Sequence, residues 1–61
     1  MQNISAKELS ALEDQLNYEQ MLVKKYQAYA QQCSDMDLQT KCTQIASKHQ
    51  EHFNKLMTYL Q

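Results

Sequence analysis

The chain has 61 residues, a formal net charge of −1, two cysteines, and neither glycine nor proline. A chain this short forms one small domain with a marginal core, so a second subunit or a metal ion is the expected support. Lys24 and Lys25 are the only adjacent lysines, which excludes a basic surface that follows nucleic-acid phosphates. No apolar stretch reaches the roughly 18–20 residues that span a bilayer. The N-terminus lacks a signal-peptide pattern, so we expect synthesis in the cytoplasm and reduced thiols.

The first predicted helix covers about residues 5–32. Ser5 and Glu8 fit a capping box, in which each side chain accepts a hydrogen bond from the other residue's backbone N–H. Ile4 is placed for the hydrophobic staple that often precedes such a box. From Ser5 onward the chain uses helix-favouring residues, and no residue breaks the helix before Gln32.

The stretch "CSDMD" is the one break in this pattern and predicts a turn at residues 33–35. Ser34 or Asp35 can cap a second helix over about residues 36–60, and Asp37 lies in its first turn, where the helix dipole favours negative charge. So short a connection makes the two helices antiparallel neighbours. The sequence therefore predicts an all-α fold, a helical hairpin in a single domain over residues 1–61.

Alternating steps of three and four residues mark an a/d seam on each predicted helix. The first seam is Leu9, Leu12, Leu16, Glu19, Val23, Tyr26, Ala30 and Cys33, and the second is Leu38, Cys42, Ile45, His49, His52, Leu56 and Tyr59. When the chain is folded at Ser34, the numbers of facing residues sum to about 68. Glu19 is then predicted to face His49, with His52 one helical turn away.

Apolar residues also extend beyond the seams on both helices. They are Ala11, Tyr18, Leu22 and Tyr29 on the first helix, and Ala46, Phe53, Met57 and Leu60 on the second. A stripe this wide suits a helix inside a bundle, and a lone hairpin would leave part of it in water. We therefore expect a homodimer in which two hairpins form a four-helix bundle.

Glu19, His49 and His52 are the ionisable residues of the two seams. Buried charge is costly unless it is paired or bound to metal, so two interpretations stay open. In the first, a neutral histidine donates to Glu19, and the polar network fixes the helix register. In the second, the three side chains bind a single ion such as zinc, or iron. The spacing resembles the Glu and Glu-x-x-His motifs of di-metal bundles, but His49 stands where the bridging carboxylate would be.

Cys33 and Cys42 do not form a C-x-x-C motif, and their numbers sum to 75, so we expect them not to face each other. The sequence predicts two small core residues here. It contains no arrangement of nucleophile and base and no glycine-rich loop, so we expect no enzymatic activity.

Two stretches, "LEDQLNYEQMLVKKYQAYAQQC" and "KCTQIASKHQEHFNKLMTYL", resemble the coat F family of spore coat proteins in endospore-forming Firmicutes. The resemblance covers about Leu9 to Leu60 and implies a ferritin-like helical fold. It also implies a structural role in sporulation or the spore coat, with other coat proteins as partners and no defined enzymatic activity. Members of that family usually carry a fuller bundle, so this chain would supply half of one.

Overall fold

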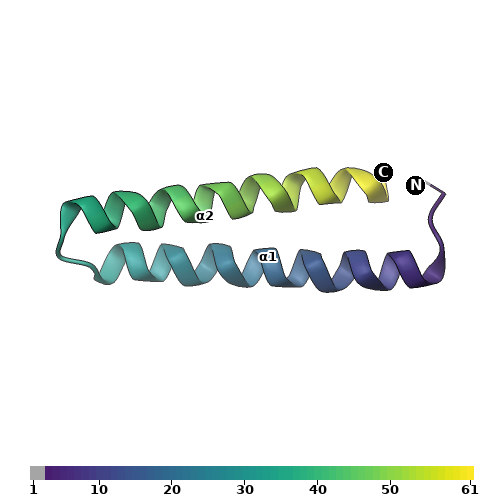
Figure 1. Ribbon diagram of the computed structural model, residues 1–61, viewed down its shortest axis with the longest axis horizontal. Coiled ribbons are helices and arrows are strands. Elements are labelled where there is room, and N and C mark those ends of the chain that lie inside the picture. Colours follow the sequence, from purple (N-terminus) through teal and green to yellow (C-terminus); the bar gives the residue numbers. More distant parts are fainter. Residues whose placement is uncertain (1–2) are drawn as a thin grey trace.

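The computed structural model describes residues 3–61 as two antiparallel helices joined by a short turn (Figure 1). Helix α1 is Ala6–Gln32, helix α2 is Met36–Met57, and a short 3-10 helix, η1, follows at Thr58–Leu60. The predicted all-α hairpin is confirmed, while residues 1 and 2 of the predicted domain lie outside the described residues. Neither helix within residues 3–61 has the length and apolarity needed to cross a membrane.

The capping box at the start of α1 is confirmed. The Glu8 backbone N–H donates to Ser5 Oγ at 3.1 Å, and the Ser5 N–H donates to Glu8 Oε1 at 3.0 Å. The backbone and side-chain hydrogen bonds from Ser5 hold the pKa of Glu8 below its ordinary value. These bonds satisfy donors that would otherwise be free at the helix start, and they define where α1 begins.

The turn is stabilised by side chains that bond to the backbone. Asp35 Oδ1 accepts from the Leu38 N–H at 2.8 Å and so caps α2, as the sequence predicts. Gln39 Nε2 donates to the Cys33 carbonyl oxygen at 2.6 Å, which ties the end of α1 to the first turns of α2. The direction in which α2 leaves the turn therefore depends on local contacts around the three residues between the helices.

The core between the helices is small. Its buried apolar side chains are Leu16, Val23, Cys42 and Ala46, and no large side chain among the described residues is fully buried. Fully burying a leucine or valine contributes about 1.5–3 kcal/mol, and this core contains only one of each. The predicted seam of α1 lies at this interface, with Leu16, Glu19 and Val23 buried at its centre.

The predicted seam of α2 is wrong in four of its seven members, Leu38, Ile45, His52 and Tyr59, which are exposed. Leu38 is 51% exposed and Ile45 is 36% exposed, whereas Ala46, predicted to lie on the flank, is buried. Compared with the predicted arrangement, α2 is rotated about its own axis. Ala46 and Phe53 therefore lie toward α1, and His52 lies toward water. A small Ala46 side chain lets the helices approach, and it is less costly to bury a phenyl ring than an imidazole.

This rotation leaves a mostly apolar surface on one side of the hairpin, which we call the His52 face. Leu38, Ile45, His52 and Tyr59 recur every seven residues along α2 and η1, and so they line up in one row. Tyr18 and Tyr29 of α1, three helical turns apart, border the row from the other helix. The five apolar members are all exposed: Tyr18, Tyr29, Leu38, Ile45 and Tyr59.

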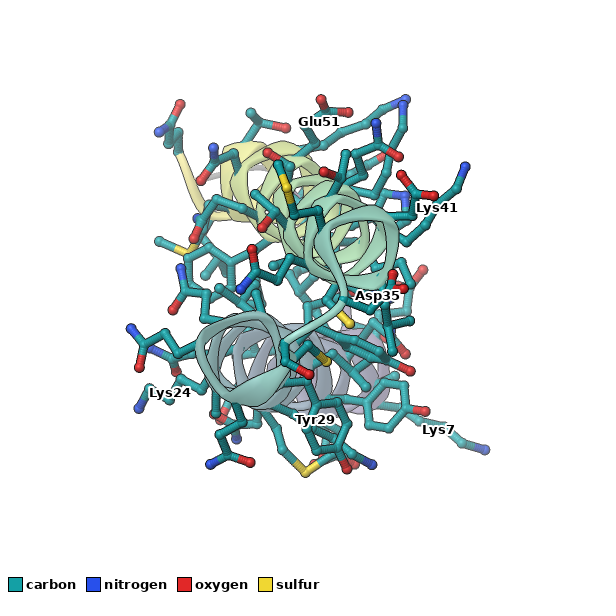
Figure 2. The ribbon with its side chains drawn as sticks, turned by 90° about the vertical axis from the view of Figure 1, so that its left-hand side faces the viewer. Lys7, Lys24, Tyr29, Asp35, Lys41 and Glu51 are labelled. Atoms are coloured by element: carbon teal, nitrogen blue, oxygen red, sulfur yellow. The ribbon has the colours of Figure 1, made fainter. Side chains whose placement is uncertain are left out.

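Lysine side chains project on both sides of the hairpin. Viewed along the helices, Lys41 and Lys24 project to opposite sides (Figure 2). Lys41, Lys48 and Lys55 recur every seven residues on α2, one position before Cys42, His49 and Leu56. A row of lysines therefore runs beside the His52 face and keeps its outer margin in contact with water.

Substituting Ser5 by Ala should lower the free energy of unfolding by about 1 kcal/mol, because the Glu8 N–H loses its acceptor. Urea denaturation followed by circular dichroism at fixed protein concentration measures the change. Ser10→Ala is the matched control, since Ser10 is exposed inside α1 and alanine favours a helix interior. Equal stability of Ser5→Ala and the wild-type protein would show that the capping box contributes nothing.

Candidate functional site

A carboxylate and two imidazoles meet halfway along the hairpin. Glu19 of α1 is 6% exposed. Its Oε1 lies 2.5 Å from His49 Nδ1, and its Oε2 lies 3.4 Å from His52 Nδ1. The structure thus brings together all three residues singled out in the sequence, with Glu19 buried, His49 half-buried and His52 exposed.

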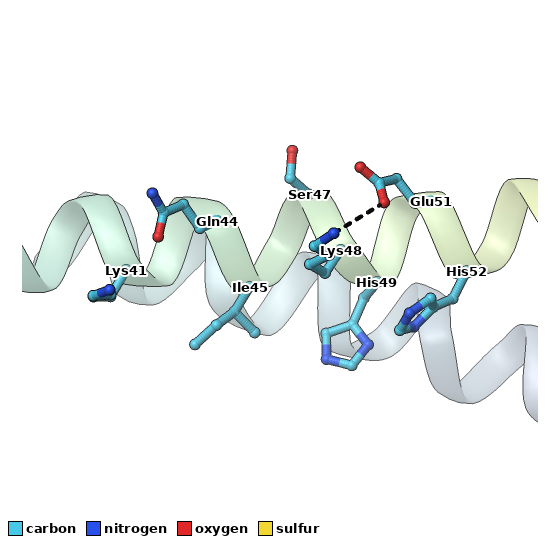
Figure 3. A pocket seen from close by; sticks show the side chains of 8 residues that line it. All are labelled: Lys41, Gln44, Ile45, Ser47, Lys48, His49, Glu51 and His52. Atoms are coloured by element: carbon cyan, nitrogen blue, oxygen red, sulfur yellow. Dashed lines mark ion pairs between the residues drawn. The ribbon is translucent and has the colours of Figure 1, made fainter.

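Helical spacing explains why the two histidines point toward the same carboxylate. Residues three apart lie on one face of a helix, so His49 and His52 of α2 are neighbours, with ring centroids 5.6 Å apart. In Figure 3 both imidazoles lie along the same side of α2 as Ile45, while Ser47 points to the opposite side. The rotation of α2 leaves His49 beside Glu19 and carries His52 to the edge of the interface.

Two further residues hold the site in place, and sequence reasoning did not assign them to it. Gln15 Nε2 donates to Glu19 Oε2 at 3.3 Å. The Tyr26 ring stacks on His49 with centroids 6.3 Å apart and planes at 20°. The position of Gln15, four residues before Glu19, is a signal that could have found it. The register sum of 68 pairs Tyr26 with Cys42. The long Tyr26 side chain instead leans back toward the start of α1 and reaches His49.

The carboxyl group of Glu19 is ionised despite its burial. Burial raises its pKa, but hydrogen bonds from His49 and Gln15 and the charges of His49 and His52 together lower it by more, so the pKa lies below its ordinary value. A carboxylate has no proton to give, so His49 Nδ1 carries the proton of the hydrogen bond. Every buried polar side-chain atom in the described part of the chain has a partner, which is what a satisfied network requires.

The arrangement can hold a proton or a metal ion between a carboxylate and two imidazoles. One ligand atom from each of Glu19, His49 and His52 lies within 4.8 Å of the others. The residues do not fit a carboxylate-bridged di-metal centre. Glu19 is the cluster's one carboxylate, and Glu51 points into solvent, where it pairs with Lys48 at 3.6 Å. The cluster therefore suits one ion or none.

Cys33 and Cys42, which the register sum does not pair, are close enough for Cys33 to affect the pKa of Cys42. Burial raises the pKa of the Cys42 thiol, and the neighbouring Cys33 raises it further through its charge and a side-chain hydrogen bond. The two come together because Cys33 follows the last turn of α1 with extended backbone, which carries it toward α2. Both thiols are free, and the raised pKa of Cys42 makes that thiol a weak nucleophile.

Replacing Glu19 by Leu should leave the hairpin within about 1 kcal/mol of wild-type stability or make it more stable. Glu19→Leu removes the buried charge, and His49 is half-buried and can stay neutral, so no uncompensated buried charge remains and the lost attraction is offset by the lost desolvation cost. Glu19→Ala, which leaves a cavity, is the comparison and should be less stable than Glu19→Leu. Both variants are measured by urea denaturation in chelator. A loss above about 3 kcal/mol for Glu19→Leu would show that the Glu19–His49 pair contributes net stability.

The chain is similar to one curated protein, which has no described role. It is 33% identical over 58 residues to "Uncharacterized protein YuzM" of Bacillus subtilis (strain 168), an alignment that covers 95% of this chain and 72% of that protein. No family model matches the chain, and no solved structure matches it. At this identity and coverage, the chain belongs to the same family as YuzM of Bacillus subtilis.

Proposed function

We propose that the chain is a structural protein that assembles by pairing two hairpins into a ferritin-like four-helix bundle, and that it serves in the spore coat or in sporulation. The main support for the pairing of two hairpins is the exposure of the His52 face. The described residues bury one leucine and one valine and leave eight large apolar side chains in water, five of them on the His52 face. This is too little core for a chain of this length.

A second copy of the chain is the occupant that suits this face. The row of Leu38, Ile45, His52 and Tyr59 has equal steps, so it can pack against itself around a twofold axis. Leu38 of one copy would then lie beside Tyr59 of the other, and Ile45 beside His52. The lysine row at the margin stays in solvent in this arrangement, as charged residues at the edge of an interface do.

Support for the coat assignment comes from sequence. The resemblance to the coat F family covers about Leu9 to Leu60. Other coat proteins, the further partners that the resemblance implies, would bind outside the His52 face, because the dimer covers that face.

Sedimentation equilibrium at micromolar protein concentration in chelator should give the mass of a dimer. Ile45→Lys places a charge on each copy next to His52 of the other, so we expect it to shift the protein toward monomer and to lower its melting temperature. Thr43→Lys is the matched control, because Thr43 is exposed on the other side of α2. A wild-type chain that is a stable folded monomer would contradict the assembly.

The coat role predicts where the protein accumulates in an endospore-forming host. Quantitative mass spectrometry should find it enriched in the extracted coat fraction of purified spores and depleted in vegetative cells. A tagged Ile45→Lys variant should be recovered from the coat at a lower level than tagged Thr43→Lys. Equal abundance of the wild-type chain in vegetative cells and spores would contradict this role.

A further inference from the structure

We infer that Glu19, His49 and His52 form a binding site for a single divalent transition-metal ion, with zinc as the best match. This inference goes beyond the structural role proposed above and does not depend on it. One carboxylate oxygen and two imidazole nitrogens make a mixed ligand set that suits a borderline ion better than magnesium or calcium, which prefer oxygen ligands alone.

The distances are close to those that zinc requires. Ligands at about 2.0–2.2 Å from a tetrahedral zinc ion lie about 3.3 Å from one another. Glu19 Oε2 lies 3.4 Å from His52 Nδ1, so this oxygen and that nitrogen already meet the spacing. His49 Nδ1 lies 2.5 Å from the other oxygen, Oε1, in a hydrogen bond that an ion must open before it takes both imidazoles and one oxygen of Glu19. A small side-chain movement is sufficient, since all three ligand atoms lie within 4.8 Å of one another.

The electrostatics of the site favour a cation. Glu19 is buried and ionised, and it faces two imidazoles, each of which offers a lone pair on Nδ1 when its proton is on Nε2. An arriving ion would take the place of the proton between His49 Nδ1 and Glu19, and a neutral His49 would then carry its proton on Nε2. No lysine pairs with Glu19 among the described residues, so the carboxylate is not neutralised by a fixed positive charge.

The surroundings orient two of the ligands and leave the third accessible. Gln15 holds one oxygen of Glu19, and the Tyr26 ring stacks on His49, so both ligands are positioned before an ion binds. His52 is 54% exposed and lines a groove between the helices together with Gln15, Glu19 and Tyr59. This groove is the entry path, and it leaves room for water as a fourth ligand.

The test uses the full chain, purified, treated with chelator and desalted. Zinc titrated in a calorimeter should bind at one ion per chain. Cobalt(II) titrated under the same conditions should give visible d–d absorption without a thiolate charge-transfer band. His52→Ala removes one ligand from an exposed position, so the fold should persist by circular dichroism while zinc affinity falls at least about tenfold. Glu19→Gln should show a similar loss.

Glu51→Gln is the matched control, because Glu51 is an exposed carboxylate one residue before His52. Zinc affinity in this variant should equal that of the wild-type chain. The inference is overturned if the wild-type chain binds no zinc, or if both His52→Ala and Glu19→Gln bind it unchanged. It is equally overturned if cobalt gives a thiolate band that disappears in Cys33→Ser. Sedimentation of the metal-free sample reports separately on dimer formation, so either proposal can fail without the other.

Discussion

The contact between the Glu19 carboxylate and the His49 imidazole sets how the two helices lie against each other. It joins the middle of α1 to the middle of α2, 30 residues away in the chain, and it is short. A slide by one helical turn would leave the Glu19 charge buried without its partner, which is far more costly than losing an exposed pair. The small apolar core cannot define the register by shape, because it contains few large side chains. The polar pair therefore supplies the specificity that packing lacks.

The rotation of α2 follows from the same contact and has a wider consequence. Turning Ala46 and Phe53 toward α1 keeps His49 at Glu19 but moves the row from Leu38 to Tyr59 out of the interface. The hairpin thus gains a close helix contact and leaves a second apolar surface in water. A chain of this kind gains most of its remaining stability from a partner, since burying that surface removes large apolar side chains from water.

His52 belongs both to the cluster with Glu19 and His49 and to the exposed apolar surface named after it. Its imidazole points toward Glu19 from the edge of the cluster, while its neighbours along α2 are the exposed apolar residues of the His52 face. Two hairpins that pack through this face would place His52 beside Ile45 of the second copy, so the cluster would lie at the margin of that interface.

The residue pattern predicts the two helices, their caps, the turn between them and the pairing of Glu19 with His49. These features depend on contacts within three or four residues and on a register that the short turn at residues 33–35 leaves little freedom to change. Which side of α2 packs against α1 could not be predicted from residue spacing. The seam and flank residues of α2 are almost equally apolar, so the fit of their side chains against α1 determines which of them are buried. The approach of Cys33 to Cys42 and of Tyr26 to His49 could not be predicted in this way either. Both depend on the direction in which backbone and side chains leave α1, which residue spacing does not encode.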